Sequence, residues 1–387
     1  MQLCYVMEEL QGLTLPPRFT CVNSSDRSFP GGHASARLNV EAPTTRSVLI
    51  SSWLEPEHVE RIRNVDPRLE VLHEPELLAP PRYIADHTAP VTRTPEQEAR
   101  WRVLLARAEI LFDFDRSSGP ELPARAPNVR WIQATSAGIG DYIRKMGFAE
   151  SMPRTVFTTA SGVHARPLAE FCIMVMLAFH KKLLVSLRDQ RERRWDRFAA
   201  GELDGQTLVI VGVGRIGKEI ARLAKAFGMR VFGVKRTVAG VDPESLHLDA
   251  LYAPDELHRA LEQAQNLVLI TPHTSETAGM IGARELALLP PGAVFINIGR
   301  GALVDERALI ETLRSGHLLG AGLDVFAQEP LPDDNPLWGM DNVIVCAHSA
   351  STAYRENERI TDLFCRNLRR YLDGEPLLNL FDHALGF

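Results

Sequence analysis

The chain has 387 residues, of which 45% are hydrophobic and 24% are charged. At about 100–200 residues per domain, this length predicts two domains, with cores large enough to need no disulfide or metal support. The formal net charge of −6 argues against nucleic acid or an anionic membrane surface as the main partner.

The five cysteines favour a reducing compartment, because their number is odd and no two stand at CxxC spacing. We therefore expect a cytoplasmic protein. The first residues include Glu8 and Glu9 and no basic segment before an apolar stretch, unlike a secretory signal. The most apolar run, 168–179, is too short to cross a bilayer, so we expect no membrane association.

The first half of the chain predicts a parallel α/β arrangement. Residues 1–46 are rich in Ser, Pro, Gly and Arg without clear periodicity, and we interpret them as a poorly ordered extension. The hydrophobic pattern then predicts strands at 47–51, 69–72, 109–114 and 129–135, with helices at 55–63 and 95–108. Alternation of this kind is typical of a parallel sheet covered on both faces by helices.

A second alternating block follows a long helical pattern. We predict one helix over 168–195, apolar first and then basic, which would link two domains or carry a subunit contact. Trp195 is assigned to the core or to that contact. Further strands are predicted at 207–211, 229–234, 266–271, 293–298, 320–326 and 342–347, with a helix at 305–315. A last helix, 354–372, should fold back onto the first block.

A glycine-rich turn joins the predicted strand 207–211 to a helical pattern. Its sequence, GVGRIG, places glycines at 212, 214 and 217. Gly212 would allow the tight turn, Gly214 the approach of a pyrophosphate, and Gly217 the packing of helix on sheet. Arg215 and Ile216 begin the helix, whose free N–H groups favour phosphate. The alternative is a plain tight turn, but strand, turn and helix in this order favour a Rossmann-type dinucleotide site.

The next predicted strand ends in Lys235, Arg236 and Thr237. An NAD site usually has an acidic residue here that accepts from the ribose 2′-hydroxyl, whereas two cations and a hydroxyl suit a 2′-phosphate. We therefore expect NADP(H). The alternative is that both cations are solvated surface charges and that NAD is bound less selectively.

Three segments just beyond predicted strands hold Arg300, Glu329 and His348. Doubly wound sheets bind ligands at the carboxyl ends of their strands, so these side chains are expected at one site. Each residue also has a possible structural role instead. Arg300 could be an ion-pair partner, Glu329 a turn residue before proline, and His348 a cap of its loop.

Together these stretches resemble the D-isomer-specific 2-hydroxyacid dehydrogenase family. The resemblance runs from about residue 47 to the end, with two departures: Ala347 stands where the family often has proline, and Lys235-Arg236 replaces the common acidic residue. Besides GVGRIG, the matching stretches are TPHTSET at 271–277, NIGRGALVDERAL at 297–309, GLDVFAQEP at 322–330, NVIVCAHSA at 342–350, VRWIQATSAGIG at 129–140 and LAEF at 168–171.

The resemblance implies that Arg300, Glu329 and His348 form the catalytic set. Histidine suits a general acid for reduction and a general base for oxidation, because its unperturbed pKa of about 6.5 lies near working pH. Glu329 would orient the imidazole and favour its protonated form. Arg300 would grip the substrate carboxylate with its planar fork and polarise the carbonyl.

Other assignments follow from the same resemblance. The backbone of Ala137 and Gly138 would bind the substrate carboxylate, or form an ordinary loop. Asp324 would face the nicotinamide carboxamide. The alternative is that its side chain only forms a structural hydrogen bond at a helix or strand end. The cofactor site would also include Thr271, Pro272 and Ile298. We expect no metal site, because the histidines are scattered, and we interpret His164, His180 and His273 as structural or surface residues.

The combined interpretation is an α/β protein of two domains. A Rossmann-type doubly wound parallel sheet would occupy 161–351, and a discontinuous, flavodoxin-like substrate domain 47–160 and 352–387. The resemblance implies an oxidoreductase that transfers a hydride between NAD(P)H and C2 of a small 2-oxo or 2-hydroxy acid, as a homodimer joined through 168–195. The alternatives are formate oxidation, whose enzymes have glutamine where this chain has Glu329, and a dinucleotide-sensing binding protein like the family's corepressors.

Overall fold

The computed structural model describes residues 45–383 and 386 of the chain. The extension expected at 1–46 lies outside the described residues except for its last two, of which Arg46 already begins a strand. Across the described residues, no helix combines the length and apolar character needed to cross a membrane.

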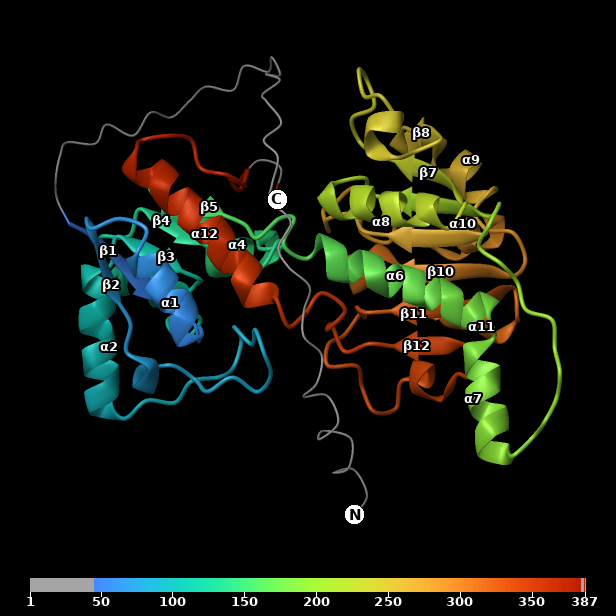
Figure 1. The fold of residues 1–387 in the computed structure, drawn as a ribbon, viewed down its shortest axis with the longest axis horizontal. Helices are drawn as coiled ribbons and strands as arrows, with labels where there is room; N and C mark the ends of the chain where they lie inside the picture. The colour runs from blue at the N-terminus through green and yellow to red at the C-terminus, as the bar shows by residue number, and fades with distance from the viewer. Residues whose placement is uncertain (1–44, 384–385, 387) are drawn as a thin grey trace, which may run out of the picture. The chain divides into compact units, whose positions relative to one another are not determined.

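A five-stranded sheet is formed by the first block (Figure 1). Its order is β2-β1-β3-β4-β5 and every pair is parallel, the order 2-1-3-4-5 of flavodoxin-like folds. The strands are β1 (Arg46–Ile50), β2 (Leu69–Leu72), β3 (Ile110–Phe112), β4 (Trp131–Gln133) and β5 (Val156–Thr158). Its helices are α1 (Pro56–Arg63), α2 (Pro95–Arg107), α3 (Leu122–Arg125), α4 (Gly140–Met146), α5 (Phe148–Ser151) and α12 (Glu356–Leu372).

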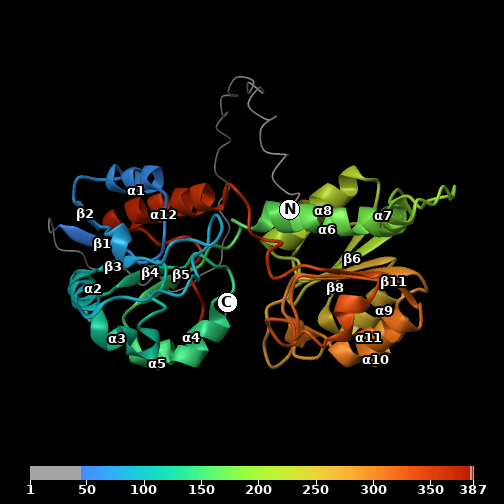
Figure 2. The same ribbon diagram turned by 90° about the horizontal axis from the view of Figure 1, so that it is seen from below.

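The last helix, α12, returns to this first sheet as the sequence predicted. Figure 2 shows α1 and α12 on one face of the five strands and α2 to α5 on the other. The buried face of α12, which includes Phe364 and Leu368, packs with Val48, Ile50 and Trp131 of the strands. Because this apolar face packs on the first sheet and on α1, segments from the two ends of the described chain share one core.

A seven-stranded parallel sheet is formed by the second block. Its order is β12-β11-β10-β9-β6-β7-β8. Strands β7 and β8 are added on one side of β6 and strands β9 to β12 on the other, so the strand order reverses between β6 and β9, as in dinucleotide-binding folds. Figure 2 shows α6 and α8 on one face and α9, α10 and α11 on the other. The strands are β6 (Thr207–Val211), β7 (Arg230–Val234), β8 (Ala250–Tyr252), β9 (Asn266–Leu269), β10 (Ala293–Asn297), β11 (Leu318–Leu323) and β12 (Val343–Val345). The helices are α6 (Ala165–His180), α7 (Leu183–Glu192), α8 (Arg215–Ala226), α9 (Leu257–Leu261), α10 (Ala283–Leu288) and α11 (Glu306–Arg314).

The single helix predicted over 168–195 is wrong, because the chain forms two helices, α6 and α7. Lys182 between them has a left-handed backbone, with φ of 55°. The backbone carbonyl of His180 accepts a hydrogen bond from the Gly201 N–H at 2.8 Å. The imidazole Nε2 of His180 is hydrogen-bonded to Oδ1 of Asn266 at 3.0 Å. These tertiary partners occupy the end of α6, so helical periodicity across the break did not mean one continuous helix.

Two further differences concern short or exposed features. Strands β5 and β8, which have three residues each, were not predicted. The placement of Trp195 in the core is wrong, since its side chain is 92% exposed.

Candidate active site

The predicted substrate-binding residues, His348 and part of the predicted cofactor set line a cavity of about 350 Å³, whereas Glu329 and the three glycines of the turn do not. The segments that follow β9, β10, β11 and β12 contribute Thr271, Arg300, Asp324 and His348 to its wall. Loops of the five-stranded sheet contribute the segment 135–138. The cavity therefore lies where carboxyl ends of parallel strands converge, as the sequence analysis expected.

His348 is held by two neighbours. Its backbone, with φ of 50°, donates an N–H to the Asp324 carbonyl at 3.0 Å. Its Nδ1 lies 2.8 Å from Oε2 of Glu329, whose Oε1 accepts from the Phe326 N–H at 3.0 Å. A carboxylate only accepts hydrogen bonds, so Nδ1 carries a proton and Nε2 is the position that exchanges one.

The electrostatics of the pair favour a protonated imidazole. The pKa of His348 is raised, chiefly by the hydrogen bond to Glu329, against the opposite effect of burial. Burial would raise the pKa of Glu329, yet that pKa is lowered because hydrogen bonds from His348 and the Phe326 N–H stabilise the carboxylate. The two shifts therefore act in the same sense, favouring the protonated form of His348 and the ionised form of Glu329.

Arg300 connects the ends of the two sheets. Its Nη1 donates to the Gly299 carbonyl at 2.7 Å and its Nη2 to the Gly138 carbonyl at 3.2 Å. A Cβ on residue 138 would lie 1.9 Å from Nη2, so any other residue there would force the guanidinium of Arg300 to shift. The Gly138 N–H donates to the Ser136 hydroxyl at 3.3 Å. Arg300, Ala137 and Gly138, the predicted substrate-binding set, all line the cavity.

Asp324 supports the loop that carries His348. Its side chain is 2% exposed, and Oδ1 accepts the N–H groups of Ser349 and Ala350 at 2.8 and 2.9 Å. This is the strand-end hydrogen bond that the sequence left as an alternative. Asp324 also lines the cavity, so its contact with a ligand stays a prediction.

The glycine-rich turn fits a dinucleotide phosphate. Gly212 has φ of 108°, and a Cβ on Gly217 would lie 2.6 Å from the Gly212 carbonyl oxygen. Gly214 is the N-cap of α8, where no described side chain caps the helix, and a Cβ there would meet no atom within 4 Å. The first-turn N–H groups therefore have no side-chain cap among the described residues, and a bound pyrophosphate could accept from them.

The remaining predicted cofactor residues are divided among three places. Ile216, Thr271, Pro272 and Ile298 line the cavity. Lys235 donates from Nζ to the Val213 carbonyl at 3.1 Å, which places its ammonium against the glycine-rich turn, and Arg236 and Thr237 beside it are exposed. Arg215 turns away, donating to the Ser161 carbonyl at 2.9 Å in a second cavity.

The sequence missed most of the cavity wall on the side of the five-stranded sheet. Tyr83, His87 and Thr88 come from a loop without periodicity, and Arg116 follows β3. Of the histidines interpreted as structural or surface residues, His164 is buried, bonded to Glu356 at 3.0 Å, and lines the cavity. His273 also lines it, 3.8 Å from Asp141, whereas His180 bonds with Asn266 outside it. Apart from His273, which lies in the stretch TPHTSET, these residues belong to no matched stretch, so only tertiary contact identifies them.

Within residues 45–383 and 386, no three His, Cys, Asp or Glu side chains are grouped so as to hold a metal ion.

Comparison with known proteins identifies the family of this site. Residues 173–350 match the sequence profile described as D-isomer specific 2-hydroxyacid dehydrogenase, NAD binding domain. A glyoxylate reductase from Thermococcus gammatolerans is 34% identical over 295 residues, which span 72% of this chain and 85% of that protein.

Solved structures share the whole arrangement. A D-isomer specific 2-hydroxyacid dehydrogenase family protein from Aeromonas salmonicida superposes with a TM-score of 0.73 at 31% identity, over 88% of this chain and 100% of the other. A D-isomer specific 2-hydroxyacid dehydrogenase from Xanthobacter autotrophicus, in complex with NADPH and MES, gives 0.71 at 28%, over 89% and 100%. The chain therefore belongs to the D-isomer specific 2-hydroxyacid dehydrogenase family and is an NAD(P)-dependent oxidoreductase of two-domain α/β fold.

Proposed function

We propose that this enzyme reduces a small 2-oxo acid to the D-2-hydroxy acid with NADPH, and that His348 is the general acid. The observation that carries the proposal is the meeting of Arg300 and a carboxylate-bonded His348 in one cavity beside the glycine-rich turn. A guanidinium for the carboxylate and a proton donor for the carbonyl are what this reduction requires.

The chain's own residues supply everything except the hydride, which the bound nicotinamide transfers to C2 of the substrate. Arg300 would hold the substrate carboxylate in its fork and draw charge onto the carbonyl oxygen. As that oxygen becomes negative, His348 would deliver the Nε2 proton to it, while Glu329 holds the Nδ1 proton and the ring's orientation. In the oxidation direction, His348 would accept the hydroxyl proton.

The NADPH preference is supported by the end of β7. Lys235 lies against the glycine-rich turn, and Arg236 and Thr237 follow with no carboxylate at the three positions. Two cations and a hydroxyl suit a ribose 2′-phosphate and would replace the acidic partner of a 2′-hydroxyl.

The organisation proposed for the enzyme follows the two sheets. The substrate domain would comprise 47–160 and 352–387, and the cofactor domain 161–351, with the cavity between them. We also propose a cytoplasmic homodimer joined through α6 and α7. The free thiols of Cys172, Cys346 and Cys365 suit the compartment, and exposed Met174, Leu183 and Leu187 suit the contact.

A panel of 2-oxo acids, assayed with NADPH and with NADH, tests the proposal. We expect NADPH-dependent reduction of glyoxylate, hydroxypyruvate or a bulkier 2-oxo acid, and a His348→Gln variant that loses about 10²–10⁴-fold in kcat while its NADPH affinity stays nearly unchanged. Activity retained by that variant would remove His348 from the mechanism. Tight NADPH binding without turnover of any 2-oxo acid would point instead to a binding protein.

A further inference from the structure

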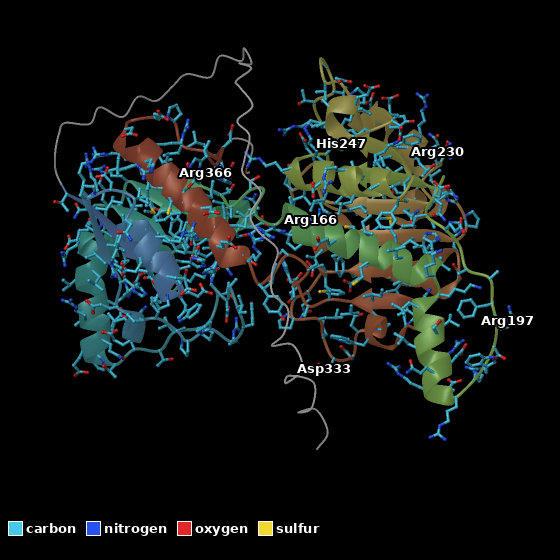
Figure 3. All side chains as sticks on the ribbon, in the orientation of Figure 1. Arg166, Arg197, Arg230, His247, Asp333 and Arg366 are labelled. Carbon is cyan, nitrogen blue, oxygen red and sulfur yellow. The ribbon has the colours of Figure 1, made fainter. Side chains whose placement is uncertain are left out.

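A second cavity, of about 610 Å³, borders α8, the helix that follows the glycine-rich turn, on the side away from the first cavity. It shares no lining residue with the first cavity. Its wall comes from α6, α8 and α12, from the segment 161–163, and from His247. Figure 3 labels Arg166 on α6, Arg366 on α12 and His247 among the side chains. Six guanidinium or ammonium groups line it, from Arg166, Arg215, Lys218, Arg222, Arg359 and Arg366, against two carboxylates, Glu219 and Asp362.

The two carboxylates do not neutralise this charge. Glu219 is shared by Arg166 at 3.3 Å and Arg222 at 2.8 Å, and Asp362 pairs with Arg61, which is not in the cavity wall. The other four cations, from residues 215, 218, 359 and 366, form no ion pair with a described carboxylate. A cavity with this excess of positive charge attracts anions.

Arg359 gives the second, independent observation. Its Nη1 is buried and has no hydrogen-bond partner among the described residues. A buried guanidinium N–H without an acceptor is costly, since the group loses its bond to water and gains none. Nη1 itself is closed to solvent, so an anion in the cavity would provide the missing acceptor only if the Arg359 guanidinium turned toward the cavity.

We propose that this cavity binds a small anion that carries two or more phosphate groups. Cations repeat along α8 at 215, 218 and 222 and along α12 at 359 and 366, so they present two rows of donors from two helices. Guanidinium groups match phosphate oxygens in a forked, charge-assisted geometry. The four cations without a paired carboxylate exceed the charge of about −2 that one phosphate carries, so an anion with two or more phosphate groups matches them better.

Binding here would join the two parts of the enzyme. Helix α8 packs on the seven-stranded sheet and α12 on the five-stranded sheet, and the segment 161–163 belongs to the connection between β5 and α6. An anion bonded to both helices would therefore bridge the sheet that carries His348 and the sheet that carries Gly138. The site would be separate from the proposed substrate site, because the two cavities share no lining residue.

Titration calorimetry with tripolyphosphate on the NADPH-saturated enzyme tests this site, since NADPH occupies the other phosphate-binding position. We expect saturable binding that Lys218→Gln and Arg366→Gln each weaken by about three- to tenfold, and a steep loss of affinity with added salt. Both side chains are exposed, so these variants should fold. Arg369→Gln is the matched control, because Arg369 is exposed on the same helix but does not line the cavity.

Parallel titrations with ATP distinguish the source of the phosphates. Tighter binding of ATP than of tripolyphosphate would identify a nucleotide as the ligand, and equal or weaker binding an inorganic polyphosphate; both support the site. No binding of either probe, or equal losses in Arg366→Gln and Arg369→Gln, would overturn it. Weakening by Lys235→Gln would also overturn it, by showing that the probe occupies the cofactor position.

Discussion

At the scale of single residues, one hydrogen bond prepares the proposed chemistry. The Glu329 carboxylate bonds to Nδ1 of His348, and the pKa of the imidazole is raised mainly for that reason. Burial of the imidazole acts in the opposite direction, so the sign of the shift depends on keeping the carboxylate ionised. The Phe326 N–H helps to do so by donating to the other carboxylate oxygen.

Replacement of Glu329 by glutamine should shift the pH dependence of both directions to lower pH. Reduction needs protonated His348. The rate of reduction is therefore highest below the pKa of His348 and falls as pH rises through that pKa. Without the carboxylate this pKa falls, so the fall in kcat/KM for reduction should occur at lower pH, and oxidation should begin at lower pH. Initial rates measured across pH in both directions check this.

Glu311→Gln, a change at an exposed carboxylate on α11, is the control and should leave both profiles in place. Profiles of the Glu329→Gln enzyme that coincide with those of the parent would mean that the carboxylate does not set the acidity of His348.

Lys235 and Arg236 should determine the choice of cofactor. Changing both to glutamine should weaken NADPH binding by about tenfold or more, as expected for lost bonds to a charged phosphate, and should change NADH binding little. Fluorescence titration with each cofactor measures this. Arg230→Gln, an exposed arginine at the other end of β7, is the matched control. Equal losses for the two cofactors would contradict recognition of the 2′-phosphate.

At the scale of elements, packing decides where the last helix lies. The residues of α12 that face the first sheet are buried, including Ile360, Phe364 and Leu368 at 0% exposure. The same helix presents Arg359 and Arg366 to the cationic cavity. One face of α12 therefore completes a core while another places charge next to α8.

Truncation of Leu368 to alanine should lower the free energy of unfolding by about 2–5 kcal/mol, because it leaves a cavity in a closed core. Urea unfolding followed by circular dichroism measures this loss. The neighbouring exposed Arg369, changed to alanine, should alter stability by less than about 0.5 kcal/mol. Similar losses in the two variants would mean that α12 does not contribute to the core of the first sheet.

At the scale of the whole molecule, the site depends on two sheets that contribute different groups. Strands of the seven-stranded sheet lead to Arg300, Glu329 and His348, while Gly138 and the loop residues Tyr83 and His87 belong to the other sheet. Arg300 bonds to the Gly138 carbonyl, so a change at this contact would affect substrate binding more than cofactor binding.

The proposed dimer should depend on apolar side chains of α7. Leu183 and Leu187 are 46% and 39% exposed, and aspartate at both positions should turn a dimer into a monomer in light scattering after size exclusion. Val103, which is 50% exposed on α2, gives the control, because aspartate there should leave the dimer intact. A parent enzyme that is monomeric at micromolar concentration would contradict the dimer proposal.

Local chemistry explains what could be predicted from the sequence. Strand β6 and the turn after it were recognisable, because apolar residues and glycines at fixed spacing directly determine a strand, a tight turn and a helix start. The segments around Arg300, Glu329 and His348 were found for the same reason, since each comes after a predicted strand of the second block and matches a family motif.

Tertiary contacts decided the rest. The break at Lys182 depends on Gly201 and Asn266, which lie about 20 and 80 residues further along the chain. The Arg300–Gly138 contact and the His164–Glu356 pair join residues more than 150 positions apart. The sequence determined which residues could bind phosphate, hold a carboxylate or carry a proton, because those capacities are properties of local backbone and side-chain chemistry. Only the tertiary structure decided which of them meet, because long-range packing brings distant segments to one cavity.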